Sequence, residues 1–186
     1  SKAFNLFETT PLASASIGQV HLAELRSGKK VAVKVQRPGI RQKFLEDLNT
    51  LEEISSLAVK HTAVGKKYAL NDVLLELRRI MLHELDYLRE ANNLVTLGIN
   101  LKSYRNLIVP QPVPDYTTSK VLTMEYVQGE KITEISPLKK VEQDFKPLVE
   151  EFIEAYLQQI VADGFVHADP HPGNIHLLEN NKIALI

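Results

Sequence analysis

Short stretches of apolar and polar residues alternate near the start of the chain, with β-branched residues prominent. Residues 17–25 are β-rich, Ser27-Gly28-Lys29 is typical of a turn, and residues 31–35 form a second apolar stretch. This succession predicts a β-hairpin. Arg37-Pro38-Gly39 ends it, because proline supplies no backbone N–H and glycine favours turns.

The apolar period changes to that of a helix over residues 40–60 and again over residues 72–97. Asn71 and Asp72 offer a cap at the start of the second helix, and Gly98 offers a stop at its end. We expect an apolar stripe of each helix to face the interior. The stripes consist of Phe44, Leu48, Leu51, Ile54 and Ala58 in the first helix and of Leu74, Leu77, Met81, Leu85 and Leu88 in the second.

The second half of the chain predicts strands, one helix and a polar loop. Residues 146–163 form an amphipathic pattern, and a polar loop covers residues 167–174. The inward positions of that helix would be Val149, Phe152, Ile153, Tyr156, Leu157 and Ile160. The predicted strands are residues 106–109, 120–126, 175–178 and 183–186. The order predicts an α+β fold, in which a small sheet-based lobe precedes part of a helical lobe with the loop at the cleft.

Composition and charge exclude several classes of function. The formal net charge is −1 and basic residues are interspersed with acidic ones, so we expect no nucleic-acid partner. The absence of cysteine rules out disulfides, thiolate metal sites and a cysteine nucleophile. No apolar run approaches the roughly 20 residues that span a bilayer, and no signal-peptide pattern is visible. Because the chain stops within an apolar run at Ile186, we expect a fragment of a longer protein. The lack of cysteine suits a reducing compartment, so we expect a cytoplasmic protein, either free or attached to a membrane in its full length.

The strongest candidate for chemistry is the loop His167-Ala168-Asp169-Pro170-His171-Pro172-Gly173-Asn174. Its two prolines and its glycine hold the backbone in a non-helical course. Such a loop can direct the carboxylate of Asp169 at a hydroxyl or a metal, and the amide oxygen of Asn174 at a second metal position. Phosphoryl transfer requires that pairing. The alternative is that both residues only cap turns.

A lysine within an apolar strand is the second candidate. Lys34 follows Val31-Ala32-Val33, where a charge is out of place unless its ammonium reaches a cleft or a counter-charge. In a nucleotide site this ammonium would contact the α- and β-phosphates. The alternative is an edge-strand lysine that faces water.

Small residues lie immediately before and within the start of the first predicted strand. They permit close approach of the backbone, whose N–H groups can surround phosphates. A small-residue turn without any ligand is the alternative. The candidate nucleotide contacts of this segment are Ala13, Ser14, Ala15, Ser16, Ile17, Gly18 and Val20.

Acidic residues on the second predicted helix offer a partner for Lys34. Glu84 borders the apolar stripe, whereas Asp86 and Glu90 share a face because they are four positions apart. An acid from this helix could hold the lysine in position. The alternative for each acid is an ordinary solvated helix charge.

A strand that runs into a Gln128-Gly129 turn is the last candidate. Backbone groups at such a strand exit can bind the edge of an adenine. A plain core strand is the alternative. The residues concerned are Met124, Glu125, Tyr126 and Val127.

These features occur in the order of a protein-kinase-like site, and almost the whole sequence closely resembles the UbiB (AarF) family of atypical protein-kinase-like proteins. An alanine-rich loop replaces the glycine-rich loop of ordinary protein kinases. The matching stretches are residues 13–21, residues 31–39 with their Gln36-Arg37-Pro38-Gly39 run, residues 84–91 and residues 167–174.

The resemblance implies ATP and Mg²⁺ as cofactors. Lys34 would contact the phosphates beneath residues 13–20, with Ala32 beside it in the strand. Asp169 would be the catalytic-loop aspartate, and Asn174 would bind magnesium. Residues 124–127 would form the adenine hinge. The family's Glu-x-Asp motif maps onto Glu84 and Asp86, and the partner of Lys34 would be either Glu84 or Glu90.

The resemblance also implies a division into two lobes. Residues 1–127 would form the N-lobe, with residues 40–60 as an additional helix and residues 72–97 as the helix that carries the acid. Residues 128–186 would form part of the C-lobe and stop before the Asp-Phe-Gly magnesium motif. The family's N-terminal Lys-x-Gly-Gln motif, thought to occlude the protein-substrate site, is missing too. We therefore expect this chain alone to bind Mg-ATP poorly and to turn over little.

By this resemblance the protein would be an ATP-dependent kinase or ATPase that supports isoprenoid (ubiquinone-type) quinone biosynthesis. The acceptor would be water, a lipid-like small molecule or a protein hydroxyl. Its partners would be lipid or quinone-biosynthesis proteins, with any membrane attachment in segments outside these residues. Two alternatives remain. His171 stands where protein kinases usually carry a lysine, which favours a small-molecule kinase of the aminoglycoside or choline type. An ATP-sensing scaffold is the second.

Overall fold

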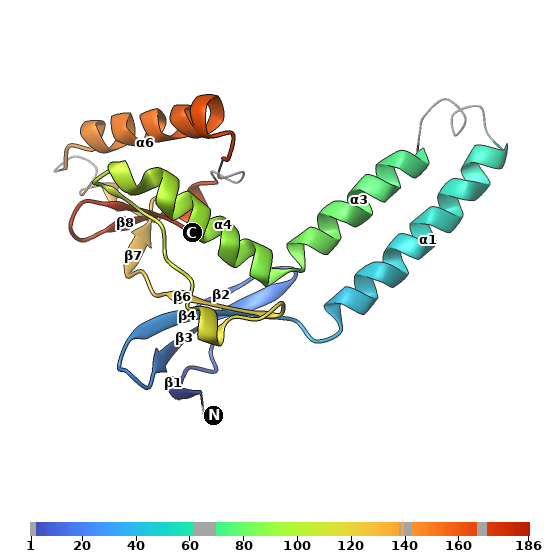
Figure 1. The fold of residues 1–186 in the computed structure, drawn as a ribbon, viewed down its shortest axis with the longest axis horizontal. Coiled ribbons are helices and arrows are strands. Elements are labelled where there is room, and N and C mark those ends of the chain that lie inside the picture. Colours follow the sequence, from blue (N-terminus) through green and yellow to red (C-terminus); the bar gives the residue numbers. More distant parts are fainter. Residues whose placement is uncertain (1–2, 62–69, 138, 140–142, 167–170) are drawn as a thin grey trace.

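The computed structural model describes residues 3–61, 70–137, 139, 143–166 and 171–186 (Figure 1). Within them the chain forms two β-sheets, a long projecting helical hairpin, and a helix, α4, that lies between the sheets. The predicted α+β fold is therefore confirmed.

The first sheet has the strand order β1-β3-β4-β6. Strand β2 lies outside this order and also pairs with β3. All its pairings are antiparallel. The predicted hairpin is present as β3 and β4, paired from Gly18 opposite Gln36 to Glu24 opposite Lys30. Sequence analysis did not predict β1 or β2. The strands are β1 Phe4–Phe7, β2 Ala13–Ser14, β3 Gly18–Leu25, β4 Lys30–Gln36 and β6 Val121–Glu125.

The helix predicted over residues 40–60 is present as α1, Ile40–His61. It forms an antiparallel hairpin with α3, Leu70–Glu84, that extends away from the sheets (Figure 1). Arg78 of α3 joins the two helices, because its guanidinium donates to Glu52 at 3.1 Å and to Asn49 at 3.0 Å.

The prediction of a single helix over residues 72–97 is wrong. The structure divides it into α3 and α4, Tyr87–Asn100, with Leu85 and Asp86 between them. Asp86 is the physical reason, because its backbone is extended and its carboxylate accepts a hydrogen bond from the N–H of Leu88 at 3.1 Å. This side-chain cap starts a new helix.

Gly98 does not stop this helix either, since α4 continues to Asn100. Gly98 instead allows a close approach, because a Cβ atom there would collide with the side-chain amide of Gln111. The glycine therefore lies against the Gln111 side chain within the helix rather than at a helix end.

The predicted apolar stripes are only partly buried. Leu48 and Leu85 are buried, as expected. Each helix of the projecting hairpin packs against the other along one side only, which leaves part of the stripe in solvent. The exposed stripe positions are Leu51, Ile54, Leu77 and Leu88. On α4 the buried face consists of Tyr87, Ala91, Leu94 and Leu97.

The second sheet has the order β5-β9-β8-β7. Strand β5 pairs parallel with β9, and the predicted last hairpin is present as β8 and β9. The turn predicted at Gln128-Gly129 is replaced by the start of β7, which pairs with β8. The strands are β5 Leu107–Ile108, β7 Gly129–Lys131, β8 Ile175–Leu178 and β9 Ile183–Leu185.

Helix α6, Lys146–Gln158, lies at the far side of this sheet and continues as a π-helical turn, Gln159–Asp163 (Figure 1). Its buried residues are Leu148 and Ala155. Among the described residues only one side of the helix is covered. Four of the six positions predicted to face inward are therefore exposed, namely Val149, Ile153, Leu157 and Ile160. No helix in the described ranges is long and apolar enough to cross a membrane.

One continuous core holds these parts together. It runs from Ala32 and Leu122 of the first sheet, through Tyr87 and Leu94 of α4, to the second sheet and α6. Because α4 packs in one core with both sheets, its side chains hold fixed positions relative to each sheet.

Candidate nucleotide site

Strand register places the predicted residues of the first sheet on one face. Val20 lies opposite Lys34, and Ala32 lies opposite Met124. Residues directly opposite in an antiparallel pair, and residues two apart in a strand, share a face of the sheet. The side of the sheet on which α4 packs therefore carries Val20, Ala32, Lys34 and Met124. The other side carries Val31 and Val33, which belong to a second apolar cluster with residues of β1.

Lys34 forms an ion pair with Glu90 of α4. The Lys34 Nζ atom lies 2.7 Å from Oε1 and 2.9 Å from Oε2 of Glu90. The side chains are 23% and 37% exposed, so the pair lies at a partly open surface. Of the two acids that the sequence left open, the structure thus pairs Lys34 with Glu90. Glu84 is exposed at the end of α3, because the break at Leu85 separates it from the turn that faces Lys34.

Tyr87, which the sequence analysis did not single out, also contacts this lysine. Lys34 Nζ lies 4.9 Å from the centre of the Tyr87 ring, a cation–π geometry. Tyr87 and Glu90 are three residues apart and so occupy one face of the first turn of α4. The sequence did contain a signal for Tyr87, namely the spacing of an aromatic residue three positions before the acid.

The small-residue segment forms β2 and a turn that leads into β3. Ala13, Ser14, Ala15 and Ser16 are exposed, Ile17 is half-buried and Gly18 is buried. Arg37 fixes this turn, because its backbone N–H donates to the Ile17 carbonyl at 2.9 Å and its Nε donates to the Ala15 carbonyl at 3.2 Å. Arg37 therefore holds the predicted phosphate loop, a role that sequence reasoning missed.

The predicted adenine hinge begins where β6 ends. The Glu125 N–H donates to the Gln111 carbonyl at 3.0 Å, and the Tyr126 N–H donates to the Lys30 carbonyl at 3.4 Å. These two amides are therefore engaged within the fold. Val127 follows them outside any strand, half-buried at the connection to the second sheet.

The Glu125 side chain is also engaged. Lys29 Nζ donates to Oε1 at 2.7 Å, and the Gln111 N–H donates to Oε2 at 3.2 Å. Burial by itself would raise the pKa of Glu125, but these two hydrogen bonds hold it below its ordinary value. Its carboxylate therefore acts as a structural anchor for the hinge segment.

The polar loop is described only at its end. The predicted catalytic residue Asp169 lies outside the described residues. Asn174 closes a short 3₁₀ turn before β8, where its N–H donates to the His171 carbonyl at 2.8 Å and its carbonyl accepts from the Ile186 N–H at 2.9 Å. His171 caps this turn by accepting from the Gly173 N–H at 3.0 Å.

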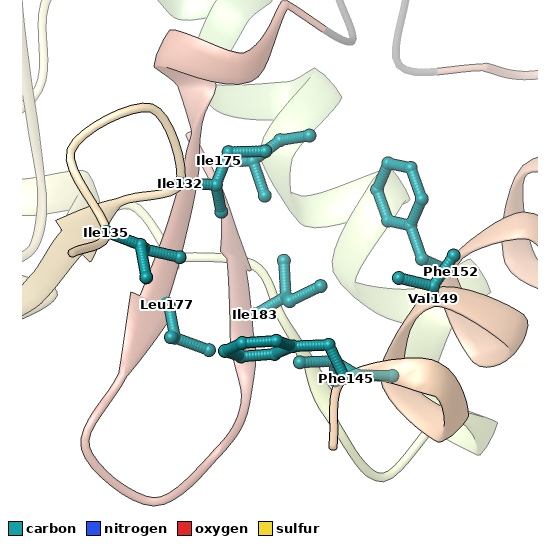
Figure 2. Close-up of a pocket in the computed structure, with 9 residues that line it drawn as sticks. Ile132, Ile135, Phe145, Val149, Phe152, Ile175, Leu177 and Ile183 are labelled. Atoms are coloured by element: carbon teal, nitrogen blue, oxygen red, sulfur yellow. The ribbon is translucent and has the colours of Figure 1, made fainter. Parts of the chain in front are cut away.

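A large apolar cavity lies away from these residues, between α6 and the second sheet (Figure 2). It has a volume of about 330 Å³ and is lined by nine apolar residues that include Phe145, Phe152 and Ile183. Among the described residues no ionisable side chain lines it, so they offer nothing there that would neutralise a phosphate. The site built around Lys34 is a separate region.

The described residues fit the phosphates of a nucleotide. The Lys34 ammonium is held by Glu90 yet stays partly exposed, and exposed small residues lie beside it on the same sheet. For Mg²⁺, the side-chain amide oxygen of Asn174 would be one ligand of the type that the ion prefers. Within the described ranges no three His, Asp or Glu side chains gather as a metal site. A complete magnesium site would therefore need residues outside those ranges.

A sheet whose strand lysine is paired to a helix glutamate, with a small-residue loop beside it, defines a protein-kinase-like fold. Comparison with known proteins makes this more specific. The family model described as the ABC1 atypical kinase-like domain matches residues 1–186. The chain belongs to this family, and the resemblance to UbiB proteins is confirmed.

Two curated relatives illustrate the similarity. The protein ACTIVITY OF BC1 COMPLEX KINASE 8, chloroplastic, of Arabidopsis thaliana is 41% identical over 98% of this chain and 24% of its own length. A probable protein kinase UbiB of Azotobacter vinelandii is 40% identical over 94% of this chain and 32% of its own length. The chain thus spans only a quarter to a third of these relatives.

A solved structure has the same fold. The complex of Rv3197 with erythromycin, from Mycobacterium tuberculosis, aligns with a TM-score of 0.73 and 29% sequence identity. The alignment covers 99% of this chain and 46% of that one.

Proposed function

We propose that this chain forms the ATP-binding part of a UbiB-type atypical kinase or ATPase that acts in isoprenoid quinone biosynthesis. The observation that carries the proposal is the Lys34–Glu90 ion pair, with Nζ 2.7 Å from the carboxylate and directed to the side of the sheet that bears the small-residue loop. Family membership and relatives named UbiB support the quinone role.

In this proposal each residue has a defined task. Lys34 neutralises charge on the α- and β-phosphates, and Glu90 holds its ammonium in place. The backbone of residues 13–18 covers the phosphates, and backbone groups of residues 124–127 other than the engaged Glu125 and Tyr126 amides bind the adenine edge. Asp169 accepts the proton of the attacking hydroxyl as its oxygen bonds to the γ-phosphorus and ADP leaves. Mg²⁺, held partly by Asn174, would neutralise the charge that develops on the phosphate oxygens.

A phosphate-release assay with radiolabelled ATP tests this function on this chain and on a polypeptide that continues beyond Ile186. We expect slow turnover by the chain and faster turnover by the longer polypeptide, with loss in Lys34→Met and Asp169→Asn. Lys131→Met is the matched control, because Lys131 pairs with Glu134 at 3.5 Å in the second sheet. Robust turnover in Lys34→Met would contradict the proposal.

A small-molecule acceptor is a second candidate. The observation that favours it is the fold neighbour Rv3197, whose structure is a complex with erythromycin. Transfer of the label to a hydroxylated small molecule, with little release of free phosphate, would favour this reaction over hydrolysis. Unchanged cellular function in Asp169→Asn would instead favour an ATP-sensing scaffold.

A further inference from the structure

Tyr87 is a buried side chain in contact with Lys34. It is fully buried, with 0% of its surface exposed, in the core that α4 shares with the first sheet. It begins α4 directly after the Asp86 cap, and its N–H donates to the Ser119 carbonyl at 3.2 Å. The ring position is thus fixed by the helix start and by core packing together.

The ring and Glu90 contact the same ammonium. The ring centre lies 4.9 Å from Lys34 Nζ, and the Glu90 oxygens lie at 2.7 and 2.9 Å. A lysine ammonium carries three N–H donors and rotates freely on a long stem. A single carboxylate fixes its distance but not its direction. A second contact, with an aromatic face from the same helical turn, restricts the direction in which the remaining donor points.

The far end of Tyr87 reaches the base of the small-residue loop. A Cβ atom at Gly18 would lie 2.6 Å from the Tyr87 hydroxyl oxygen and 2.7 Å from the Val35 carbonyl oxygen. Gly18 is therefore required for a close approach at the point where the loop enters β3. One side chain thus contacts both the predicted phosphate loop and the predicted phosphate lysine.

The hydroxyl does not suit proton transfer. It is buried and has no hydrogen-bond partner among the described residues. Burial, and then the charges of Glu90 and Glu84, raise the pKa of Tyr87 to about 12. The hydroxyl therefore stays protonated near neutral pH, and the ring face is the part of Tyr87 that acts on Lys34.

We infer that Tyr87 is a positioning residue whose ring, together with Glu90, directs the Lys34 ammonium at the nucleotide phosphates. The inference rests on the proposed function, because it assigns Tyr87 to the same nucleotide site. It adds that the site needs an aromatic face at this position, which phenylalanine supplies and a smaller aliphatic residue such as leucine does not.

A double-mutant cycle of Mg-ATP affinity tests this. Tyr87→Leu should weaken binding by about 2- to 30-fold, the range expected for losing a cation–π contact, and Tyr87→Phe should recover most of that loss. In a Lys34→Met background, Tyr87→Leu should have no further effect, because the ring then has no cation to direct. Equal weakening in both backgrounds would mean that Tyr87 acts through core packing, and would overturn the inference.

Tyr116→Leu is the matched control. Tyr116 packs with Phe4 on the opposite face of the same sheet, with ring centres 5.5 Å apart. Its loss should lower stability without a Lys34-dependent change in affinity. A coupling to Lys34 as large as that of Tyr87 would show that the cycle reports general destabilisation, which would count against the inference.

Two measurements need no nucleotide, so they separate this inference from the proposed function. In denaturant unfolding of the same variants, Tyr87 and Lys34 should show a coupling free energy, and strict additivity would overturn the ring contact. If Tyr87→Leu fails to fold, NMR of the wild type decides. The ε-methylene protons of Lys34 should be shifted upfield by the ring, and an ordinary lysine position would overturn the inference. Absence of Mg-ATP binding by the wild type, with the coupling intact, would reject the proposed function but retain the ring contact.

Discussion

The side-chain amide of Gln36 donates a hydrogen bond to the backbone carbonyl of Leu85 across 2.6 Å. The same amide donates to the Ser119 carbonyl at 3.1 Å. The end of β4 is thereby joined to the break between α3 and α4. Since α4 carries Glu90, this link helps to set where the acid meets Lys34.

Gln36→Ala should therefore lower the free energy of unfolding by about 1–3 kcal/mol, because it leaves a buried carbonyl without its partner. Chemical denaturation measures this. Gln42→Ala is the control, because Gln42 donates to the exposed Glu46 on the same helix at 2.9 Å, a bond whose loss should change stability little. Equal effects of the two substitutions would show that the Gln36 link does not stabilise the break.

Asp86→Ala should destabilise the protein by about 1 kcal/mol, the usual value of a helix N-cap. The N–H of Leu88, which Asp86 now satisfies at 3.1 Å, would lose its acceptor. Thermal or denaturant unfolding gives the value. Asp86→Asn should recover much of the loss, since asparagine caps equally well. An asparagine variant as unstable as the alanine variant would argue that the charge of Asp86, rather than its cap, is what matters.

Glu90→Gln and Glu84→Gln separate the two acids that the sequence could not distinguish. Glu90→Gln should weaken Mg-ATP binding about tenfold or more, because it removes the charge that holds Lys34. Glu84→Gln should weaken Mg-ATP binding clearly less, since Glu84 is exposed at the end of α3. Calorimetric titration of both variants decides, and a larger loss in Glu84→Gln would contradict the site geometry.

Stability should depend on pH through Glu125. Its folded-state pKa lies below the ordinary value, so the carboxylate contributes stability above the unfolded-state pKa of about 4.3, and that contribution disappears as pH falls through the lower, folded-state value. The stability advantage of the wild type over Glu125→Gln should therefore shrink as the solution is acidified. Unfolding midpoints measured at several pH values test this, and an advantage that grows toward acid pH would give the wrong sign.

Much of the site's sheet could be predicted from the sequence. The apolar stretch around Lys34 and the turn before it predict the β3–β4 hairpin, and the strand period of two then decides which of its residues share a face. The helix positions were harder. The run from Asn71 to Leu97 has one continuous apolar period, and only the Asp86 cap and its tertiary contacts divide it. Pattern alone does not show such a break.

The pattern also does not show what covers a helix. Val149 and Ile153 of α6 have the spacing of an inward face, yet both are exposed among the described residues. Amphipathic spacing indicates that a face is apolar, but the covering surface comes from tertiary structure. Tyr87 was missed for a related reason, since its importance lies in a contact with Lys34, which is distant in sequence.

Calorimetric titration with Mg-ATP of the wild-type chain and of Lys34→Met, with Lys131→Met as the control, shows whether Lys34 holds the nucleotide. We expect measurable binding by the wild type and by Lys131→Met, strengthened in a polypeptide that continues beyond Ile186, and a large loss in Lys34→Met. Binding that is undiminished in Lys34→Met would contradict the proposal, because the nucleotide would then be held without the ammonium that Glu90 and Tyr87 surround.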